Sequence, residues 1–96
     1  SGVGRNLQLA GLLDVRETNE FEQGRLPNAL HIPLSQLAGR IGEVKGKHDL
    51  PVIVYCASGR RSRMAGATLA KAGFKDIYHL TGGIAAWRGA GLPVEK

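Results

Sequence analysis

The 96-residue sequence contains a single cysteine, few aromatic residues and no long apolar run. A single cysteine excludes an internal disulfide and any metal site built from a cluster of cysteines. The chain lacks the roughly 20 consecutive apolar residues of a membrane-spanning helix and shows no signal peptide, so we expect no membrane contact by this segment. One cysteine also suits a reducing cytosol, and we expect a cytoplasmic location.

Basic residues outnumber acidic ones by 13 to 8, which makes the formal net charge +5. Only Arg60, Arg61 and Arg63 form a dense cluster, and the other basic residues are spread along the chain. Aromatic residues make up 5% of the sequence and do not interleave with this cluster, which argues against a stacking platform for single-stranded nucleic acid. We therefore expect a local site for small anions and no nucleic-acid partner.

Short apolar runs alternate with helical patterns, which is typical of an α/β domain with a mostly parallel sheet. The predicted strands cover residues 12–15, 29–32, 52–55 and 77–80, and the predicted helices cover residues 18–23, 34–41, 59–72 and 84–88. The run 52–55 is β-branched and uncharged, so it is predicted to lie in the centre of the sheet. Residues 1–11 are interpreted as a tail or a truncated edge element, and residues 12–96 as one domain.

Cys56 stands where the predicted central strand gives way to a helix. Gly59 lets the intervening loop curl, and such a loop directs backbone N–H groups at one point beside the helix N-terminus. Helix N-termini and neighbouring cations lower the pKa of a thiol. Arg60, Arg61 and Ser62 are expected to add charge and hydroxyl donors for an anionic substrate. The pattern therefore predicts a reactive thiolate rather than a core thiol.

Asp14 and Arg16 follow a second predicted strand. Ligands of open parallel sheets bind beyond the carboxyl ends of the strands, so these two residues are expected near Cys56. We expect them to support the pocket as a buried ion pair that holds the loop. The three histidines lack the spacing of a metal site, so no metal is expected.

Four segments, in order, resemble the rhodanese family of sulfurtransferases. They are Asp14-Val15-Arg16-Glu17 with Phe21-Glu22-x-Gly24, then Pro27-x-Ala29-x-His31-Ile32-Pro33-Leu34, then Cys56-Ala57-Ser58-Gly59-Arg60-Arg61-Ser62, and finally Leu80-x-Gly82-Gly83-x-x-Ala86-Trp87 with Ala90-Gly91-x-Pro93-Val94. The resemblance covers residues 12–95. It implies a rhodanese-like three-layer fold, in which a mostly parallel sheet of four to five strands has helices on both faces.

The resemblance also implies an activity and its residues. Cys56 would be catalytic, taking a sulfane sulfur from a small anionic donor such as thiosulfate and holding it as a persulfide. A thiophilic acceptor (cyanide, a thiol or a partner protein) would then remove it. The loop that binds the persulfide would consist of Ala57, Ser58, Gly59, Arg60, Arg61 and Ser62. No metal or organic cofactor is required.

Three alternative interpretations follow from departures of this sequence from the family pattern and from proteins of related fold. Only 13 residues precede Asp14, whereas many single-domain members begin with a further strand and helix, so a longer or membrane-anchored parent protein is an alternative. A Cdc25-like phosphatase or arsenate reductase shares the fold, but its loop needs arginine where this chain has Ser62. A non-catalytic interaction module is a third alternative.

Overall fold

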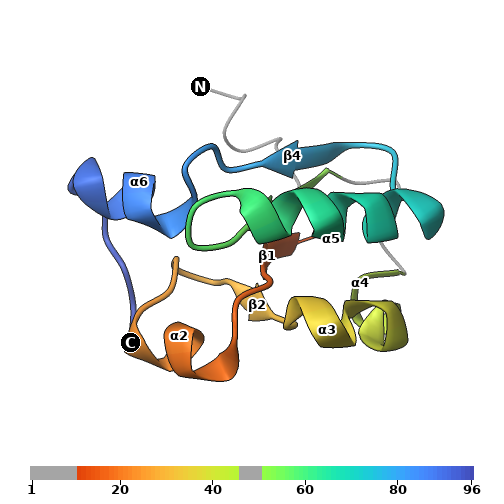
Figure 1. The fold of residues 1–96 in the computed structure, drawn as a ribbon, viewed down its shortest axis with the longest axis horizontal. Coiled ribbons are helices and arrows are strands. Elements are labelled where there is room, and N and C mark those ends of the chain that lie inside the picture. Colours follow the sequence, from red (N-terminus) through yellow and green to blue (C-terminus); the bar gives the residue numbers. More distant parts are fainter. Residues whose placement is uncertain (1–10, 46–50) are drawn as a thin grey trace.

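Parallel strands form the centre of the computed structural model, which describes residues 11–45 and 51–96 (Figure 1). Its elements in chain order are β1 (Gly11–Asp14), α2 (Thr18–Gln23), β2 (Leu30–His31), α3 (Leu34–Leu37), the 3-10 helix η1 (Ala38–Arg40), α4 (Gly42–Lys45), β3 (Val52–Tyr55), α5 (Arg60–Lys71), β4 (Ile77–His79) and α6 (Gly83–Gly89). The tail or edge element expected over residues 1–11 lies outside the described residues, except for Gly11, which begins β1.

The sheet of the described residues has the order β2-β1-β3-β4, and every neighbouring pair is parallel. β3 therefore lies inside the sheet, as its uncharged, β-branched sequence predicts. In the register between β1 and β3, Asp14 lies opposite Tyr55, which brings the carboxyl ends of the two inner strands together. Cys56 and Arg16 consequently leave the sheet at the same end.

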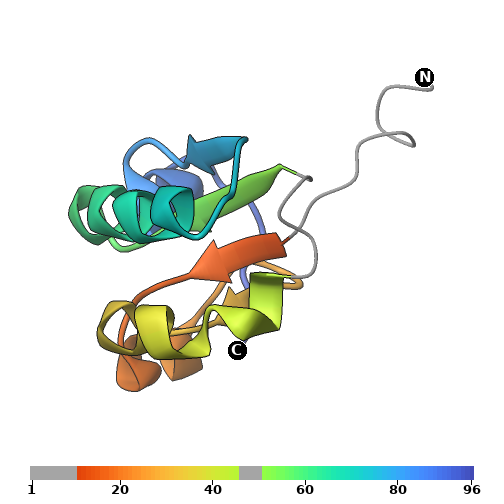
Figure 2. The same ribbon diagram turned by 90° about the vertical axis from the view of Figure 1, so that its right-hand side faces the viewer.

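The hydrophobic core divides into one cluster on each face of the sheet. Val52 and Val54 of β3 pack in the larger cluster with Leu69 of α5, and α3 and α5 lie together on this side (Figures 1 and 2). Tyr55 faces the other way and packs with Ile84 of α6. Successive side chains of β3 thus point to opposite faces of the sheet and contribute to both clusters. These observations confirm the predicted α/β fold with a parallel sheet and helices on both sides.

The region after β2 differs from the prediction. A single helix was expected over residues 34–41, but the chain divides into α3, η1 and α4. Gly39 and Gly42 explain the interruption, since glycine favours helix less than other residues except proline. In one continuous helix Ala38 would share the buried face with Leu34 and Leu37, but in the structure it is exposed, while Leu37 stays buried.

The N-terminus of α2 is a smaller correction. Threonine is a favoured cap residue, which makes Thr18 the predicted cap of this helix, but the cap residue is Glu17. The Glu20 side chain accepts a hydrogen bond from the Glu17 N–H at 2.9 Å, half of a capping-box arrangement. Across residues 11–45 and 51–96, no helix has the length and apolar character required to cross a membrane.

Candidate active site

Cys56 lies directly after β3 and is 1% exposed. Its sulfur is surrounded by the loop of residues 56–62 that leads into α5. The Gly59 N–H donates a hydrogen bond to Sγ at 3.0 Å. Gly59 has φ +110°, a left-handed conformation that side-chain-bearing residues rarely adopt, so glycine is needed for this N–H to face the sulfur.

The loop is closed by Ser62, which is fully buried. Its hydroxyl donates to the Gly59 carbonyl oxygen at 2.9 Å. The sequence suggested this hydroxyl as a donor to a substrate anion, but in the structure it bonds to the loop itself. Ser62 therefore fixes the curvature of the loop.

The environment of Cys56 favours its thiolate. Burial raises the pKa of the thiol, but backbone N–H groups of the loop outweigh burial and lower this pKa below its ordinary value. In order of effect, these N–H groups belong to Ser62, Gly59, Ser58 and Arg61. The N-terminus of the 12-residue helix α5 adds positive potential in the same place.

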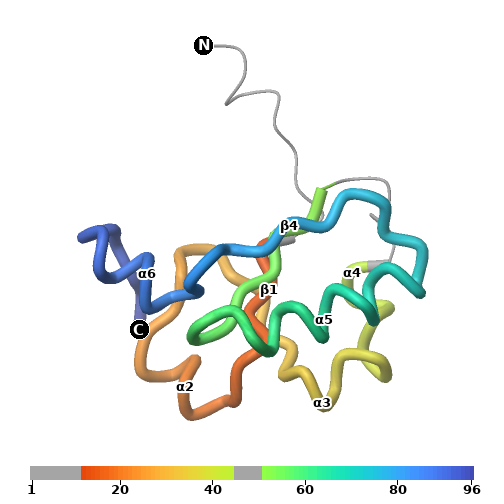
Figure 3. Tube along the Cα trace, turned by 45° about the horizontal axis from the view of Figure 1, so that its top comes forward, coloured from red at the N-terminus to blue at the C-terminus, as the bar shows by residue number. Residues whose placement is uncertain are grey.

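Helix α6 holds the opposite side of the loop (Figure 3). The Ile84 N–H donates to the Cys56 carbonyl oxygen at 2.9 Å, and the Ala85 N–H donates to the Ala57 carbonyl oxygen at 3.2 Å. Because these two carbonyls point toward α6, α6 fixes the orientation of the first peptide groups of the loop. Gly83 permits this approach, since a Cβ there would collide with the Cys56 carbonyl oxygen. The contact between Gly83 and the loop was not predicted from the sequence.

Arg61 pairs with α2. Its Nη1 and Nη2 donate to the two carboxylate oxygens of Glu20 at 2.7 and 2.9 Å. The Arg61 hydrogen bonds lower the pKa of Glu20 to about 2. Glu20 was not identified from the sequence as a partner of the loop, and the structure shows a bidentate pair that ties α2 to it. The partners are 41 residues apart in sequence, so no local pattern reveals them.

Asp14 and Arg16 form the buried ion pair that was expected. Arg16 Nη2 lies 2.7 Å from Asp14 Oδ2 and also donates to the Gly24 carbonyl oxygen at 2.6 Å. The Arg16 guanidinium lies 5.7 Å from the centre of the Tyr55 ring, next to Cys56 in sequence. The pair joins the ends of β1 and α2 beneath the site, and the hydrogen bonds that the Arg16 side chain donates go to Asp14 and Gly24 rather than to the loop.

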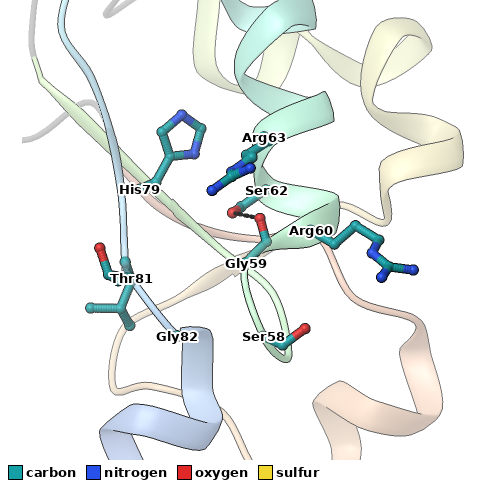
Figure 4. A pocket seen from close by; sticks show the side chains of 9 residues that line it. Ser58, Gly59, Arg60, Ser62, Arg63, His79, Thr81 and Gly82 are labelled. Atoms are coloured by element: carbon teal, nitrogen blue, oxygen red, sulfur yellow. Dashed lines mark hydrogen bonds between the residues drawn. The ribbon is translucent and has the colours of Figure 1, made fainter.

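A cavity of about 570 Å³ lies beside the loop rather than over the sulfur (Figure 4). The loop and the start of α5 form one wall, and the segment from His79 to Gly82 forms the other. Its lining residues are Ser58, Gly59, Arg60, Ser62, Arg63, His79, Leu80, Thr81 and Gly82. Cys56 does not line this space. Arg63 and His79 extend into the gap between α5 and β4, whereas the Arg60 side chain extends to the other side of the loop.

Comparisons with known proteins agree with the geometry. The family model described as "Rhodanese-like domain" matches residues 3–90. The chain is 49% identical over 80 residues to the uncharacterized protein YqhL of Bacillus subtilis, covering 83% of this chain and 62% of that protein. It is 39% identical over 88 residues to the thiosulfate sulfurtransferase GlpE of Actinobacillus succinogenes, covering 90% of this chain and 76% of that protein.

A solved structure shows the same fold. The rhodanese-related protein of Thermoplasma volcanium superposes with a TM-score of 0.80 at 35% identity, covering 88% of this chain and 82% of that one. The chain spans less than two thirds of the length of its Bacillus subtilis relative. Because the family model covers most of the sequence and the fold agrees, the chain belongs to the rhodanese-like domain family.

Proposed function

We propose that this domain is a sulfurtransferase that carries sulfane sulfur as a persulfide on Cys56. The observation that carries the proposal is the cradle of backbone N–H groups around a buried sulfur whose thiol pKa is lowered. A nucleophile in its anionic form needs no general base. The name of the Actinobacillus relative supports thiosulfate as the donor to be tested first.

The first half-reaction starts from the Cys56 thiolate. It attacks the outer sulfur of thiosulfate, a sulfur–sulfur bond forms to Cys56, and the bond within thiosulfate breaks. The electron pair of the broken bond leaves with sulfite, so no proton and no external oxidant is needed. The loop N–H groups that stabilise the thiolate also stabilise the anionic persulfide.

The second half-reaction restores the enzyme. The thiolate of an acceptor attacks the terminal sulfur of the persulfide, and Cys56 leaves as a thiolate stabilised by the same cradle. Cyanide would accept the sulfur in the same way and give thiocyanate. The Asp14–Arg16 pair would act as support, since it fixes the end of β1 beside Tyr55, the last residue of the strand that leads to Cys56.

Two features favour sulfur over phosphate as the transferred group. A phosphatase loop ends in an arginine that neutralises the phosphate oxygens, and Ser62 occupies that place here. Arg61, the nearest substitute, is already paired with Glu20. The loop therefore lacks a free arginine where a phosphatase places one to stabilise the transferred phosphoryl group, whereas a single sulfur atom carries no such oxygens.

The test is the intact mass of the protein after incubation with thiosulfate, measured beside a Cys56→Ser control. We expect a gain of one sulfur atom on the native protein only, lost on addition of cyanide with formation of thiocyanate. A phosphate-ester assay runs in parallel. Ester turnover without sulfur gain would establish the phosphatase alternative. If neither reaction occurs, the non-catalytic interaction module is the remaining interpretation.

A further inference from the structure

The cavity beside the loop is larger than sulfur transfer from thiosulfate requires. At about 570 Å³ it lies in the range of pockets for small organic ligands. In thiosulfate the sulfonate is one bond from the transferred sulfur, so it must lie close to Cys56 itself. Gly59 both lines the cavity and donates its N–H to Sγ. One loop residue, Gly59, therefore separates the cavity from the sulfur, and the cavity has room for the remainder of a longer molecule.

The charges around this cavity favour an anion. None of the described residues that line it is acidic, and the positive side chain of Arg63 extends into it. Within residues 11–45 and 51–96, no carboxylate forms an ion pair with Arg63, in contrast to Arg61. Arg63 and His79 extend into the same gap between α5 and β4 (Figure 4). Guanidinium and imidazole groups both donate hydrogen bonds suited to a carboxylate.

The position of His79 is created by a glycine on the facing helix. A Cβ at Gly66 would lie 2.7 Å from Cε1 and 3.0 Å from Nε2 of His79, so only glycine lets the ring lie against α5 at this point. Gly66 is buried and follows Arg63 by three residues, which places the two next to each other on the helix surface. The glycine thus leaves room for the imidazole on the same side of α5 as the Arg63 side chain (Figure 4).

From these observations we propose that Arg63 and His79 select the sulfur acceptor, which is a small thiol carrying a carboxylate. The inference rests on the proposed sulfurtransferase function and names the class of its second substrate. The carboxylate lies in the cavity while the thiolate attacks the terminal sulfur of the Cys56 persulfide. The sulfur passes to the acceptor, and the electron pair of the broken bond stays on Cys56.

The kinetic test compares two acceptors, 3-mercaptopropionate and the uncharged 2-mercaptoethanol. In Arg63→Gln, kcat/KM for 3-mercaptopropionate is expected to fall about tenfold, the effect of losing one charge-assisted hydrogen bond. The value for 2-mercaptoethanol is expected to change less than about twofold, since that thiol has no carboxylate to bind. Persulfide formation from thiosulfate, followed by mass in a single turnover, should keep its native rate.

Two further variants separate position from charge. Lys71→Gln removes the same charge from the opposite end of α5 and should leave the ratio of the two acceptors unchanged. Gly66→Ala keeps every charge and favours the helix, but it displaces the His79 ring. We expect it to reduce the preference for 3-mercaptopropionate. An equal loss for both thiols, or a loss confined to persulfide formation, would overturn the proposal.

A binding measurement makes the result independent of sulfur transfer. The thioether 3-(methylthio)propionate carries the carboxylate but accepts no sulfur. Its titration should shift the imidazole NMR signals of His79 in the native protein and not in Arg63→Gln. A shift without persulfide formation would refute the sulfurtransferase and keep the carboxylate site, whereas persulfide formation without a shift would refute the acceptor site alone.

Discussion

Replacing Gly83 by alanine tests whether α6 fixes the thiolate loop. Gly83 has φ +61°, and a Cβ there would contact the Cys56 carbonyl oxygen and lie 2.6 Å from the Ala57 carbonyl oxygen. Both obstacles are backbone atoms, so no side chain can move aside. Either α6 or the first peptide groups of the loop must shift. We expect the loop N–H groups to turn from the sulfur and the pKa of Cys56 to rise toward its ordinary value.

The expected magnitude has two parts, and Gly91 separates them. Alanine in a left-handed conformation costs about 1–2 kcal/mol. Gly91 has φ +77°, and a methyl group added there would meet nothing within 4 Å, so Gly91→Ala should lose only this amount. Gly83→Ala should lose a further amount of about 1–3 kcal/mol, because the added methyl group overpacks its surroundings. Domains of this kind have about 5–15 kcal/mol of stability, so both variants should remain folded.

Urea unfolding gives the stability of each variant, and ultraviolet absorbance of the thiolate gives the Cys56 titration. Only Gly83→Ala is expected to raise the midpoint of that titration. Equal losses of stability in the two variants, together with an unchanged Cys56 titration in both, would refute the idea that contact between α6 and the loop positions the N–H groups.

Three other predictions concern charge. The thiol of Cys56 should titrate with a pKa below its ordinary value of 9.0, measured by absorbance with Cys56→Ser as the baseline. The thiolate contributes fully to the free energy of unfolding above the ordinary pKa, and this contribution is lost as pH falls through the pKa of the folded state. Titration at or above 9.0 would contradict the stabilisation of the thiolate by the loop N–H groups. Glu20→Gln should cost about 1 kcal/mol at pH 7 in urea unfolding. This difference should shrink as pH falls from 4.5 toward 2, because the native carboxylate then gains a proton; a constant difference would argue against the Arg61 pair. Asp14→Asn should cost about 3–5 kcal/mol by leaving the Arg16 charge buried and unpaired, and a loss in urea unfolding below about 1 kcal/mol would show that the pair is dispensable.

Much of the fold follows from local patterns. The bounds of β3 and, within one residue, of α5 agree with prediction, because an uncharged β-branched run and a continuous helical face are strong signals. The region of residues 34–45 did not agree with the predicted single helix, because its apolar spacing suits a helix while its glycines weaken one. The parallel direction of the strands also agreed, because strands separated by helices favour it.

The candidate site divides in the same way. Its position at the end of β3 and the need for glycine at residue 59 were evident from the sequence, because both are properties of the local backbone. The hydrogen-bond acceptor of the Ser62 hydroxyl was not evident from the sequence, because a hydroxyl beside an anion site has several possible acceptors. Only the structure shows that this hydroxyl donates to the Gly59 carbonyl oxygen.

The sequence by itself determined a thiol at the junction of a buried strand and a helix, with the glycine that its loop requires. Only the tertiary structure decided what surrounds that thiol. It paired Arg61 with Glu20, brought α6 against the loop carbonyls, and left Arg63 beside His79 at the cavity. The physical reason is range: backbone conformation depends mainly on residues that are close in sequence, whereas the partner of a charge depends on the path of the whole chain.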